Sequence, residues 1–259
     1  MSYIYSIIIP SLNEEKFLPT LLQSIAKQRE KNFEVIVVDG CSQDKTREVV
    51  LAFSKKFPLQ IFSSTKRNVA YQRNYGAQKA KGEYLVFLDA DAQIYPSFAQ
   101  RIGKVMKQKK GVLFLPALVP DRATPKNKVI FSVLNAMIEA SQTLGKPLTT
   151  SGLIFVEKNF FRTMNGFDET ALMVEDHDFV VRARKLGVKA RFLKDVKVIF
   201  SLRRARKEGE FTLLMKYIIS ATKIFMGRKV KEGVSYEQGG HVYQAETFQR
   251  TLKKKNVNL

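Results

Sequence analysis

The chain has 259 residues, of which 45% are hydrophobic and 26% charged, the proportions of an ordinary globular protein with a sizeable core. The single cysteine, Cys41, excludes an intramolecular disulfide; the first ten residues show no signal pattern, and no apolar run reaches the roughly 18 residues that span a bilayer, so a cytoplasmic protein is expected. The net charge of +20 predicts an anionic partner, whether nucleic acid, anionic lipid or a phosphorylated substrate.

Apolar runs alternate with helical segments through the first part of the chain. Strands are expected at residues 5–10, 33–40, 59–64 and 83–89, and helices at about 14–28, 44–55 and 68–81. Strands separated by helices of about 10 to 15 residues form βαβ units. The predicted fold class is therefore α/β, with a mostly parallel sheet and helices on both faces. The strands are apolar throughout rather than alternating, as expected for a sheet that is covered on both sides.

Polar residues follow three of these strands where they end: Pro10 to Asn13, Asp39 to Asp44, and Asp89 to Asp91. In open α/β sheets ligands bind beyond the carboxyl ends of the strands. The sequence therefore predicts a binding rim there. Asp is also a favoured turn residue, and Asp176 and Asp178 repeat the spacing of Asp89 and Asp91, so this pair of acids is weak evidence by itself.

Four segments in a fixed order resemble family 2 glycosyltransferases with the GT-A fold: "SIIIPSLNEE" at 6–15, "VIVVDGCSQDKT" at 35–46, "RNVAYQRNYGAQKAKGEYLVFLDADA" at 67–92 and "MNGFDETALMVEDHDFVVRARKLG" at 164–187. The resemblance implies a Rossmann-like GT-A domain over residues 1–205. Residues 206–259 are expected to form a C-terminal helical extension, with an amphipathic helix and a basic tail.

The chain departs from the family at two points. The second motif reads "GCSQD" where the family usually has a Gly-Ser-Thr-Asp type of turn, and Ser201 stands where many GT-A enzymes place a metal-binding histidine. His241 is an alternative source of that ligand, although a loop histidine is the simpler interpretation. Cys41 is expected to be a small loop residue.

The resemblance implies a nucleotide-sugar donor, whose diphosphate leaving group gains negative charge as the glycosidic bond breaks. A divalent cation, Mn²⁺ or Mg²⁺, held by carboxylate oxygens neutralises such charge. Asp91 is the expected metal ligand, and Asp89 is expected to assist it or to contact the donor.

The resemblance also implies a set of donor-binding residues, in which uridine is the expected base: Pro10, Asn13, Glu15, Asp39, Arg73 and Asp89. Pro10, Asn13 and Glu15 are expected beyond the first strand. Two simpler interpretations remain open. Asn13 could cap a helix that has Glu14 and Glu15 in its first turn, and Arg73 could be a solvated surface arginine.

The acidic cluster "VEDHDF" at 174–179 is expected to open a helix that runs to Lys185, where acids favour the positive end of the helix dipole. By resemblance Asp176 is the general base of an inverting transfer, with Glu175 supporting it. If the acceptor is a phosphate, which is already ionised, Asp176 would orient the acceptor or a cation instead.

The segment "SLRRARKEG" places Arg203 and Arg204 near the catalytic rim, where arginine suits an acceptor phosphate; a solvated basic loop is the alternative. The helix expected at 210–227 has only a narrow polar stripe, which fits a helix buried against protein or lying on anionic lipid. The helix expected at 127–144 is also rich in apolar residues and could flank it.

The sequence thus predicts an inverting glycosyltransferase that moves a sugar, most plausibly from a UDP-sugar, to a membrane-lipid or polyprenyl-phosphate acceptor. It would be attached peripherally to the cytoplasmic face of a membrane. A soluble saccharide or protein acceptor is the alternative. A basic nucleic-acid-binding protein is a remote one, because the chain has no aromatic-basic RNA signature or zinc pattern and that function leaves the rim motifs unexplained.

Overall fold

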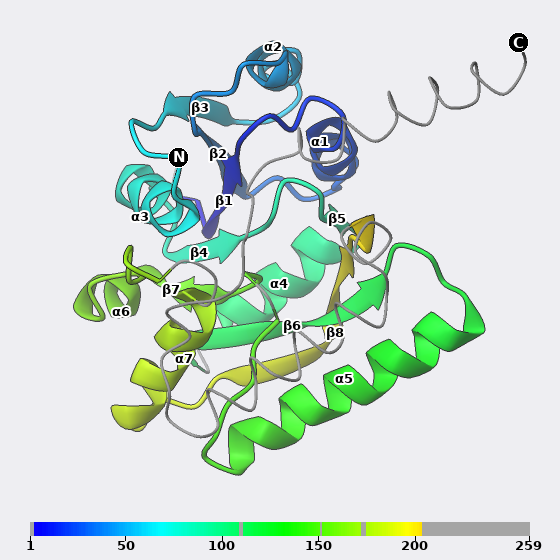
Figure 1. Ribbon diagram of the computed structural model, residues 1–259, viewed down its shortest axis with the longest axis vertical. Coiled ribbons are helices and arrows are strands. Elements are labelled where there is room, and N and C mark those ends of the chain that lie inside the picture. Colours follow the sequence, from blue (N-terminus) through cyan, green and yellow to red (C-terminus); the bar gives the residue numbers. More distant parts are fainter. Residues whose placement is uncertain (1–2, 109–110, 151, 172–174, 204–259) are drawn as a thin grey trace, which may run out of the picture.

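Strands and helices alternate along the chain in the computed structural model, which describes residues 3–108, 111–150, 152–171 and 175–203 (Figure 1). The elements are β1 (Tyr5–Ser11), α1 (Leu18–Ala26), β2 (Phe33–Asp39), α2 (Thr46–Leu51), β3 (Leu59–Ser63), α3 (Val69–Lys79), β4 (Tyr84–Phe87), β5 (Gln93–Ile94), α4 (Phe98–Lys107), β6 (Leu113–Pro120), α5 (Pro125–Thr143), β7 (Phe155–Glu157), α6 (Lys158–Thr163), α7 (Glu175–Lys185) and β8 (Arg191–Phe200). The predicted boundary at residue 205 and the extension at 206–259 lie outside the described residues.

One eight-stranded sheet, in the order β3-β2-β1-β4-β7-β6-β8-β5, organises the molecule. β3, β2, β1 and β4 are parallel neighbours, and β6 is parallel to β8. β7 runs antiparallel to both β4 and β6, and β5 runs antiparallel to β8. The predicted α/β sheet is confirmed. Its continuous parallel part is the half built from residues 5 to 87, and the other half is mixed.

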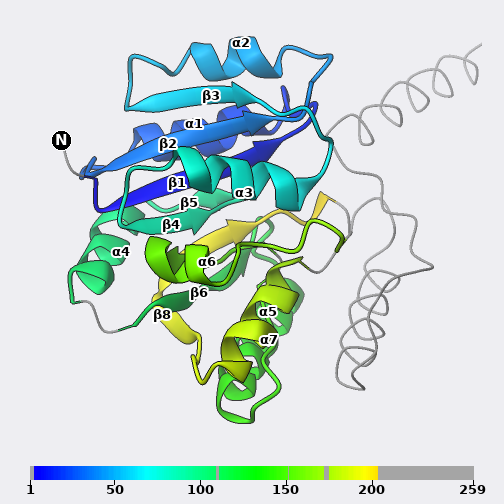
Figure 2. The ribbon, with the colours of Figure 1, turned by 90° about the vertical axis from the view of Figure 1, so that its left-hand side faces the viewer.

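The core lies on both faces of the sheet. In β1, Ile7 and Ile9 join the cluster that contains α1 and α4, whereas Ile8 joins the cluster that contains α3 and α7. Because successive side chains of a strand point to opposite faces, strands buried on both faces are mostly apolar, and the buried Ser6 and Glu34 satisfy each other with a hydrogen bond at 2.7 Å. β3 with α2 lies at one end of the molecule and α5 at the other (Figures 1 and 2).

The first helix begins later than predicted. α1 starts at Leu18, its N-cap residue is Phe17, and Pro19 lies in its first turn. Asn13 has a left-handed backbone (φ 53°) and its side chain accepts a hydrogen bond from Gln43 N at 2.7 Å. The interpretation of Asn13 as a helix cap is therefore wrong, because its side chain bonds to a neighbouring loop.

Candidate active site

The loop after β1 and the loop after β2 bond to each other at the carboxyl ends of these strands, which form part of the rim. Asn13 N donates to Ser42 Oγ at 2.8 Å, and Glu15 Oε2 accepts from Lys45 N at 3.0 Å. Asn13 and Glu15 therefore lie at the rim as predicted, and both brace the loop after β1 against the loop after β2. Pro10 does not lie beyond the first strand: it is buried within β1, opposite Val38 of β2, because the ladder continues to Ser11.

Asp39 is the last residue of β2 and is almost fully buried. Its carboxylate accepts hydrogen bonds from both N and Oγ of Ser42. Arg47 Nη1 lies 3.9 Å from Asp39 Oδ2. A buried carboxylate at the end of a central parallel strand is placed to bind a polar ligand group at the rim.

Arg73 of α3 connects the rim to the second half of the molecule. Its side chain is buried, and Nη2 donates to Asp89 Oδ1 at 2.6 Å while Nη1 donates to Glu175 Oε1. The guanidinium carbon lies 5.9 Å from the ring centroid of Phe167. The alternative of a solvated surface arginine is therefore wrong, because Arg73 joins two acids that come from β4 and α7.

Gly152 completes this arrangement, and sequence analysis did not identify it. Its backbone is left-handed (φ +86°), and a Cβ built there would lie 2.3 Å from Arg73 Nη2 and 3.2 Å from Asp89 Oδ1. Only glycine combines this conformation with so close an approach to the ion pair. The signal available in the sequence was a lone glycine directly before the apolar run that becomes β7.

Asp176 lies in the first turn of α7 and is buried. Asp176 Oδ2 accepts from Thr149 Oγ1 at 2.8 Å and from Gly152 N at 2.9 Å. Glu175, Asp176 and Asp178 all lie in this first turn, as the helix dipole favours. The predicted helix start is confirmed, and Glu175 and Asp176 also bond to Arg73, Thr149 and Gly152 near the rim. The role of Asp176 as general base stays a prediction.

Arg203, directly after β8, binds two acids at the other side of the rim. Its Nη1 and Nη2 donate to the two carboxylate oxygens of Glu14, each at 2.8 Å, and its Nε lies 2.8 Å from Asp91 Oδ2. Its guanidinium also lies 4.5 Å from the ring centroid of Phe17. Sequence analysis did not identify Glu14 as part of the site. Arg204 lies outside the described residues.

Burial and charge together set the protonation of these groups. Burial raises the pKa of Glu14 against the opposing effect of Arg203, and the charges of Asp91 and Asp89 raise this pKa further. Burial likewise raises the pKa of Glu175, although Arg73 opposes it. Burial by itself lowers the pKa of Arg73, but the charges of Glu175, Asp89 and Asp176 outweigh this effect and raise it. Arg73 therefore stays cationic.

Asp89 and Asp91 at the rim suit a divalent cation that is bound together with a phosphate-containing ligand. Within the described residues no group of three or more His, Cys, Asp or Glu side chains is placed to hold a metal ion. Asp89 and Asp91 supply hard carboxylate oxygens, and Mg²⁺ is commonly bound through one or two carboxylates, water and substrate phosphates. The residues present therefore fit Mg²⁺ or Mn²⁺ bound jointly with a diphosphate. Ser201 supplies no imidazole, and His241 lies outside the described residues.

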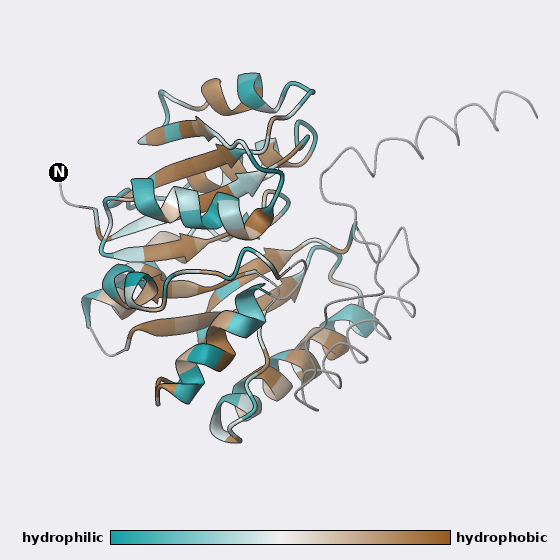
Figure 3. Cartoon of the chain, turned by 60° about the vertical axis from the view of Figure 1, so that its left-hand side comes forward, coloured by the Kyte–Doolittle hydropathy of each residue, from teal (hydrophilic) through white to brown (hydrophobic). Residues whose placement is uncertain are grey.

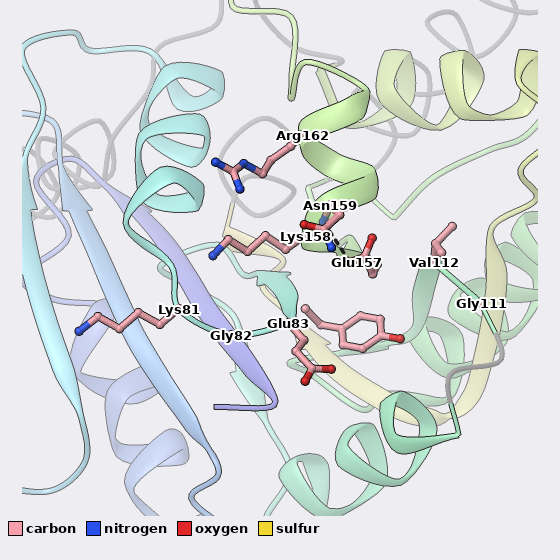
Figure 4. A pocket seen from close by; sticks show the side chains of 10 residues that line it. Lys81, Gly82, Glu83, Gly111, Val112, Glu157, Lys158, Asn159 and Arg162 are labelled. Atoms are coloured by element: carbon pink, nitrogen blue, oxygen red, sulfur yellow. Dashed lines mark hydrogen bonds between the residues drawn. The ribbon is translucent and has the colours of Figure 1, made fainter. Parts of the chain in front are cut away.

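A separate hollow of ≈ 560 Å³ lies at the opposite ends of the strands (Figure 4). It is lined by residues that precede β4 and β6 and by the start of α6, among them Lys81, Glu83, Val112 and Lys158. None of the rim residues described above lines it. The acids and arginines that the sequence predicts for the site lie at the carboxyl ends of the strands instead.

Fold and rim together define an α/β protein with buried and ion-paired acids at the carboxyl ends of its parallel strands, and the comparisons with known proteins identify the family. Residues 6–164, more than half of the chain, match the family described as Glycosyl transferase family 2, and the chain therefore belongs to this family.

Two curated relatives illustrate the range of this likeness. An uncharacterized glycosyltransferase of Haemophilus influenzae is 30% identical over 184 residues, which cover 68% of this chain and 60% of that protein. The amylovoran biosynthesis glycosyltransferase AmsB of Erwinia amylovora is 28% identical over 207 residues, which cover 71% of this chain and 65% of AmsB. The chain thus spans somewhat less than two thirds of the length of these relatives.

Solved structures confirm the GT-A fold. TarS of Staphylococcus aureus in complex with UDP-GlcNAc superposes with a TM-score of 0.63 at 23% identity, covering 76% of this chain and 58% of that one. The mannosyltransferase PcManGT of Pyrobaculum calidifontis, in complex with GDP-Man and Mn²⁺, gives 0.62 at 20% identity, covering 77% of this chain and 57% of that one.

Proposed function

We propose that the protein is an inverting, metal-dependent glycosyltransferase that moves a sugar from a nucleotide-sugar, with UDP-sugars favoured, to a membrane-lipid or polyprenyl-phosphate acceptor. The observation that carries the proposal is the pair of hydrogen bonds from Arg73, which hold Asp89 after β4 and Glu175 of α7 against one buried guanidinium. A donor-side acid and an acceptor-side acid are thereby fixed relative to each other.

The donor would bind across the ends of β1, β2 and β4. Asp39 would accept hydrogen bonds from the base or ribose, and Asn13 and Glu15 would hold the loops around it. Asp91, assisted by Asp89, would hold Mn²⁺ or Mg²⁺ against the diphosphate; the bound cation supplies Lewis-acid stabilisation of the leaving group. The UDP-GlcNAc and the GDP-Man with Mn²⁺ named for the two solved neighbours support this donor class and leave the base open.

Asp176 would accept the proton of the attacking acceptor hydroxyl. Its hydrogen bonds from Thr149 and Gly152 both end on Oδ2. They orient the carboxylate, and Oδ1 would then be the oxygen that takes the proton. A general base held in this way accelerates such a transfer by roughly 10²- to 10⁴-fold. Glu175 would support Asp176 through Arg73. For a phosphate acceptor, Asp176 would orient the acceptor instead.

The acceptor side rests on Arg203 and, beyond the described residues, Arg204. Arg203 faces the carboxylates of Glu14 and Asp91, so a phosphate at the rim would compete with them for its guanidinium. No helix within the described residues has both the length and the apolar character to cross a bilayer. From the net charge of +20, we propose peripheral attachment at the cytoplasmic face, with the GT-A domain at 1–205 and an anchoring extension at 206–259. A soluble acceptor remains the second candidate.

A ligand screen tests the proposed function. UDP- and GDP-sugars are each added to the protein with Mn²⁺ or with a chelator, and the unfolding temperature is measured. A ligand at 100 times its Kd stabilises the native state by about 2.7 kcal/mol, so the true donor should raise the unfolding temperature by several degrees with Mn²⁺ and less with the chelator. Absence of stabilisation by every nucleotide-sugar under both conditions would overturn the proposal.

A further inference from the structure

Helix α5 turns polar side chains inward. Asn127, Ser141 and Gln142 are buried, although the helix lies at the outside of the molecule. Asn135 fixes the helix to β6, since its side chain accepts from Leu118 N at 2.9 Å and donates to Leu118 O at 2.8 Å. The side of α5 that packs on the sheet therefore combines apolar contacts of Phe131 and Ile138 with the hydrogen bonds of Asn135 to β6.

The outer side of α5 is apolar. Val129, Val133 and Met137 follow one another at four-residue spacing and are 63%, 54% and 54% exposed, and Ile130 and Leu144 on the same side are 38% and 78% exposed. At about 100° per residue all five lie within about 60° of Val133, along a stripe of about 22 Å. We call these five residues the α5 stripe. Figure 3 shows apolar residues along this helix.

Basic residues surround the α5 stripe. Lys126 and Lys128 are exposed in the first turn of α5, and Lys146 is exposed just after its end. A Cβ on Gly145 would lie 3.9 Å from Arg184 Nη2, which places the end of α7 beside the end of α5. Glu139, the one acid within α5, is paired with Lys194 at 2.9 Å.

We propose that the α5 stripe lies on an anionic bilayer surface, with its apolar side chains among the lipid chains and the surrounding lysines at the headgroups. This inference names the partner surface of the lipid-acceptor version of the proposed function and rests on that version. An exposed apolar stripe of this length with basic residues around it is typical of an interfacial helix. Leu186, 66% exposed at the end of α7, would add to the same contact.

Charge favours a bilayer over the two other occupants, a second copy of the chain and the segment that follows Arg203. A second copy would bring Lys126 and Lys128 against their own counterparts if the two helices were parallel, and against Lys146 if they were antiparallel. The segment 204–231 contains Arg204, Arg206, Lys207, Lys216, Lys223, Arg228, Lys229 and Lys231, and only two acids, Glu208 and Glu210. Either occupant would bring like charges together at the ends of α5, whereas anionic headgroups would neutralise them.

The position of α5 also connects the bilayer to the rim. Phe131 of α5 and Phe200 of β8 lie with ring centroids 6.2 Å apart, and Leu202 N donates to Asp121 Oδ2 at 3.2 Å. The start of α5 is thus beside the end of β8, next to Arg203. A lipid acceptor in a bilayer under α5 would have a short path to the rim.

The absence of tryptophan from the sequence allows a direct test. Met137→Trp places one reporter in the α5 stripe of the full-length chain, and its emission is measured with vesicles of phosphatidylcholine alone, with added phosphatidylglycerol, and with brominated chains. We expect solvent-exposed emission without vesicles, then a blue shift and quenching by the brominated chains only when phosphatidylglycerol is present. Emission that is already blue without vesicles, and is not quenched, would show that protein covers the stripe and would overturn the inference.

A matched pair of exposed residues gives the second measurement. Met137→Glu should lower binding to phosphatidylglycerol vesicles at least tenfold, whereas Leu51→Glu on α2, where Leu51 is 55% exposed, should leave it unchanged. Unfolding temperatures of both variants confirm folding. Unchanged binding of Met137→Glu would place the membrane contact elsewhere and overturn the inference. Stabilisation of the same variants by nucleotide-sugar and Mn²⁺ without vesicles reports separately on the proposed function.

Discussion

The two halves of the sheet are built differently. In the half made of β3, β2, β1 and β4, all strands are parallel, and along the chain they alternate with the helices that cover them. β1, β2 and β4 are buried along their whole length and end at the same rim. In the half made of β7, β6, β8 and β5, pairing is mixed, and α5 turns apolar side chains outward. We therefore assign the nucleotide-sugar donor to the strand ends of the first half, and the contact with the bilayer to the second half.

Arg73 is the link between the halves. It belongs to α3, which packs on β1 and β2, yet it donates to Glu175 of the second half as well as to Asp89 of the first. Substitutions in the first half should therefore affect donor and cation binding, and substitutions in the second half should affect transfer or partner contact. Substitutions at the contacts of Arg73 itself should affect both. The predictions below test this division, beginning with the largest effect.

Asp91→Asn should lower sugar transfer at least about a thousandfold, because the cation loses its expected anionic ligand and several kcal/mol of stabilisation of the leaving group. Transfer and Mn²⁺-dependent donor binding are both measured, and both should fall. Asp195→Asn, an exposed residue of β8, is the matched control and should behave as wild type. Full activity of the wild type in the presence of chelator would show that transfer needs no cation and that the role given to Asp91 is wrong.

Asp176→Asn should lower turnover about a hundredfold to a thousandfold with donor affinity nearly unchanged, because the general base is lost and the donor site is not. Asp178→Asn is the control, since Asp178 lies in the same turn but pairs with Arg182 at 2.7 Å. An equal loss of donor binding in Asp176→Asn would assign α7 to the donor half. A mild loss of turnover with intact binding would favour the phosphate acceptor.

The first half was the more predictable from sequence because its information is local. Apolar strands, their covering helices and the polar residues at their ends follow one another in the chain, so the rim positions of Asp39, Asp89 and Asp91 could be inferred. Helix starts were less predictable: Asn13 resembles a cap, but its side chain bonds to Gln43 in another loop.

The contacts between the halves were not predictable, because they depend on residues far apart in sequence. Glu14 and Arg203 are separated by 189 positions. No local sequence pattern indicates that Arg203 donates two hydrogen bonds to Glu14 and also contacts Asp91. Gly152 acquires its role only when Arg73 and Asp89 are brought against it. The helix at 127–144 was predicted as a possible flank of the helix at 210–227, but its pattern does not show which apolar side chains are exposed.

Gly152→Ala should lower transfer about tenfold and weaken donor binding, because the new methyl group would displace Arg73 from Asp89. Gly187→Ala is a close control: its backbone is also left-handed (φ +81°), but a Cβ there meets no atom within 4 Å. Both variants should lose about 1 kcal/mol or more of stability from backbone strain. Only Gly152→Ala should lose activity, and equal activities would show that the ion pair tolerates the change.

The smallest effect concerns His177 of α7, which is 8% exposed. Burial lowers the pKa of His177, against the opposing charges of Asp176 and Asp178. As pH falls from about 6.5, the ordinary histidine value, the unfolded chain takes up this proton before the native one does. The stability that neutral His177 contributes is therefore present above about pH 6.5 and is lost as pH falls through the lowered native pKa.

His177→Gln cannot gain that charge, so wild type should lose stability relative to this variant between about pH 6.5 and pH 5, by about 1.4 kcal/mol for each unit of pKa difference. The free energy of unfolding from urea titrations at several pH values measures the effect. His241→Gln changes the other histidine of the chain and is measured for comparison. If the free energies of unfolding of wild type and His177→Gln change with pH in parallel, His177 has the same pKa in the native and the unfolded chain. Its burial beside Asp176 would then contribute no pH-dependent stability.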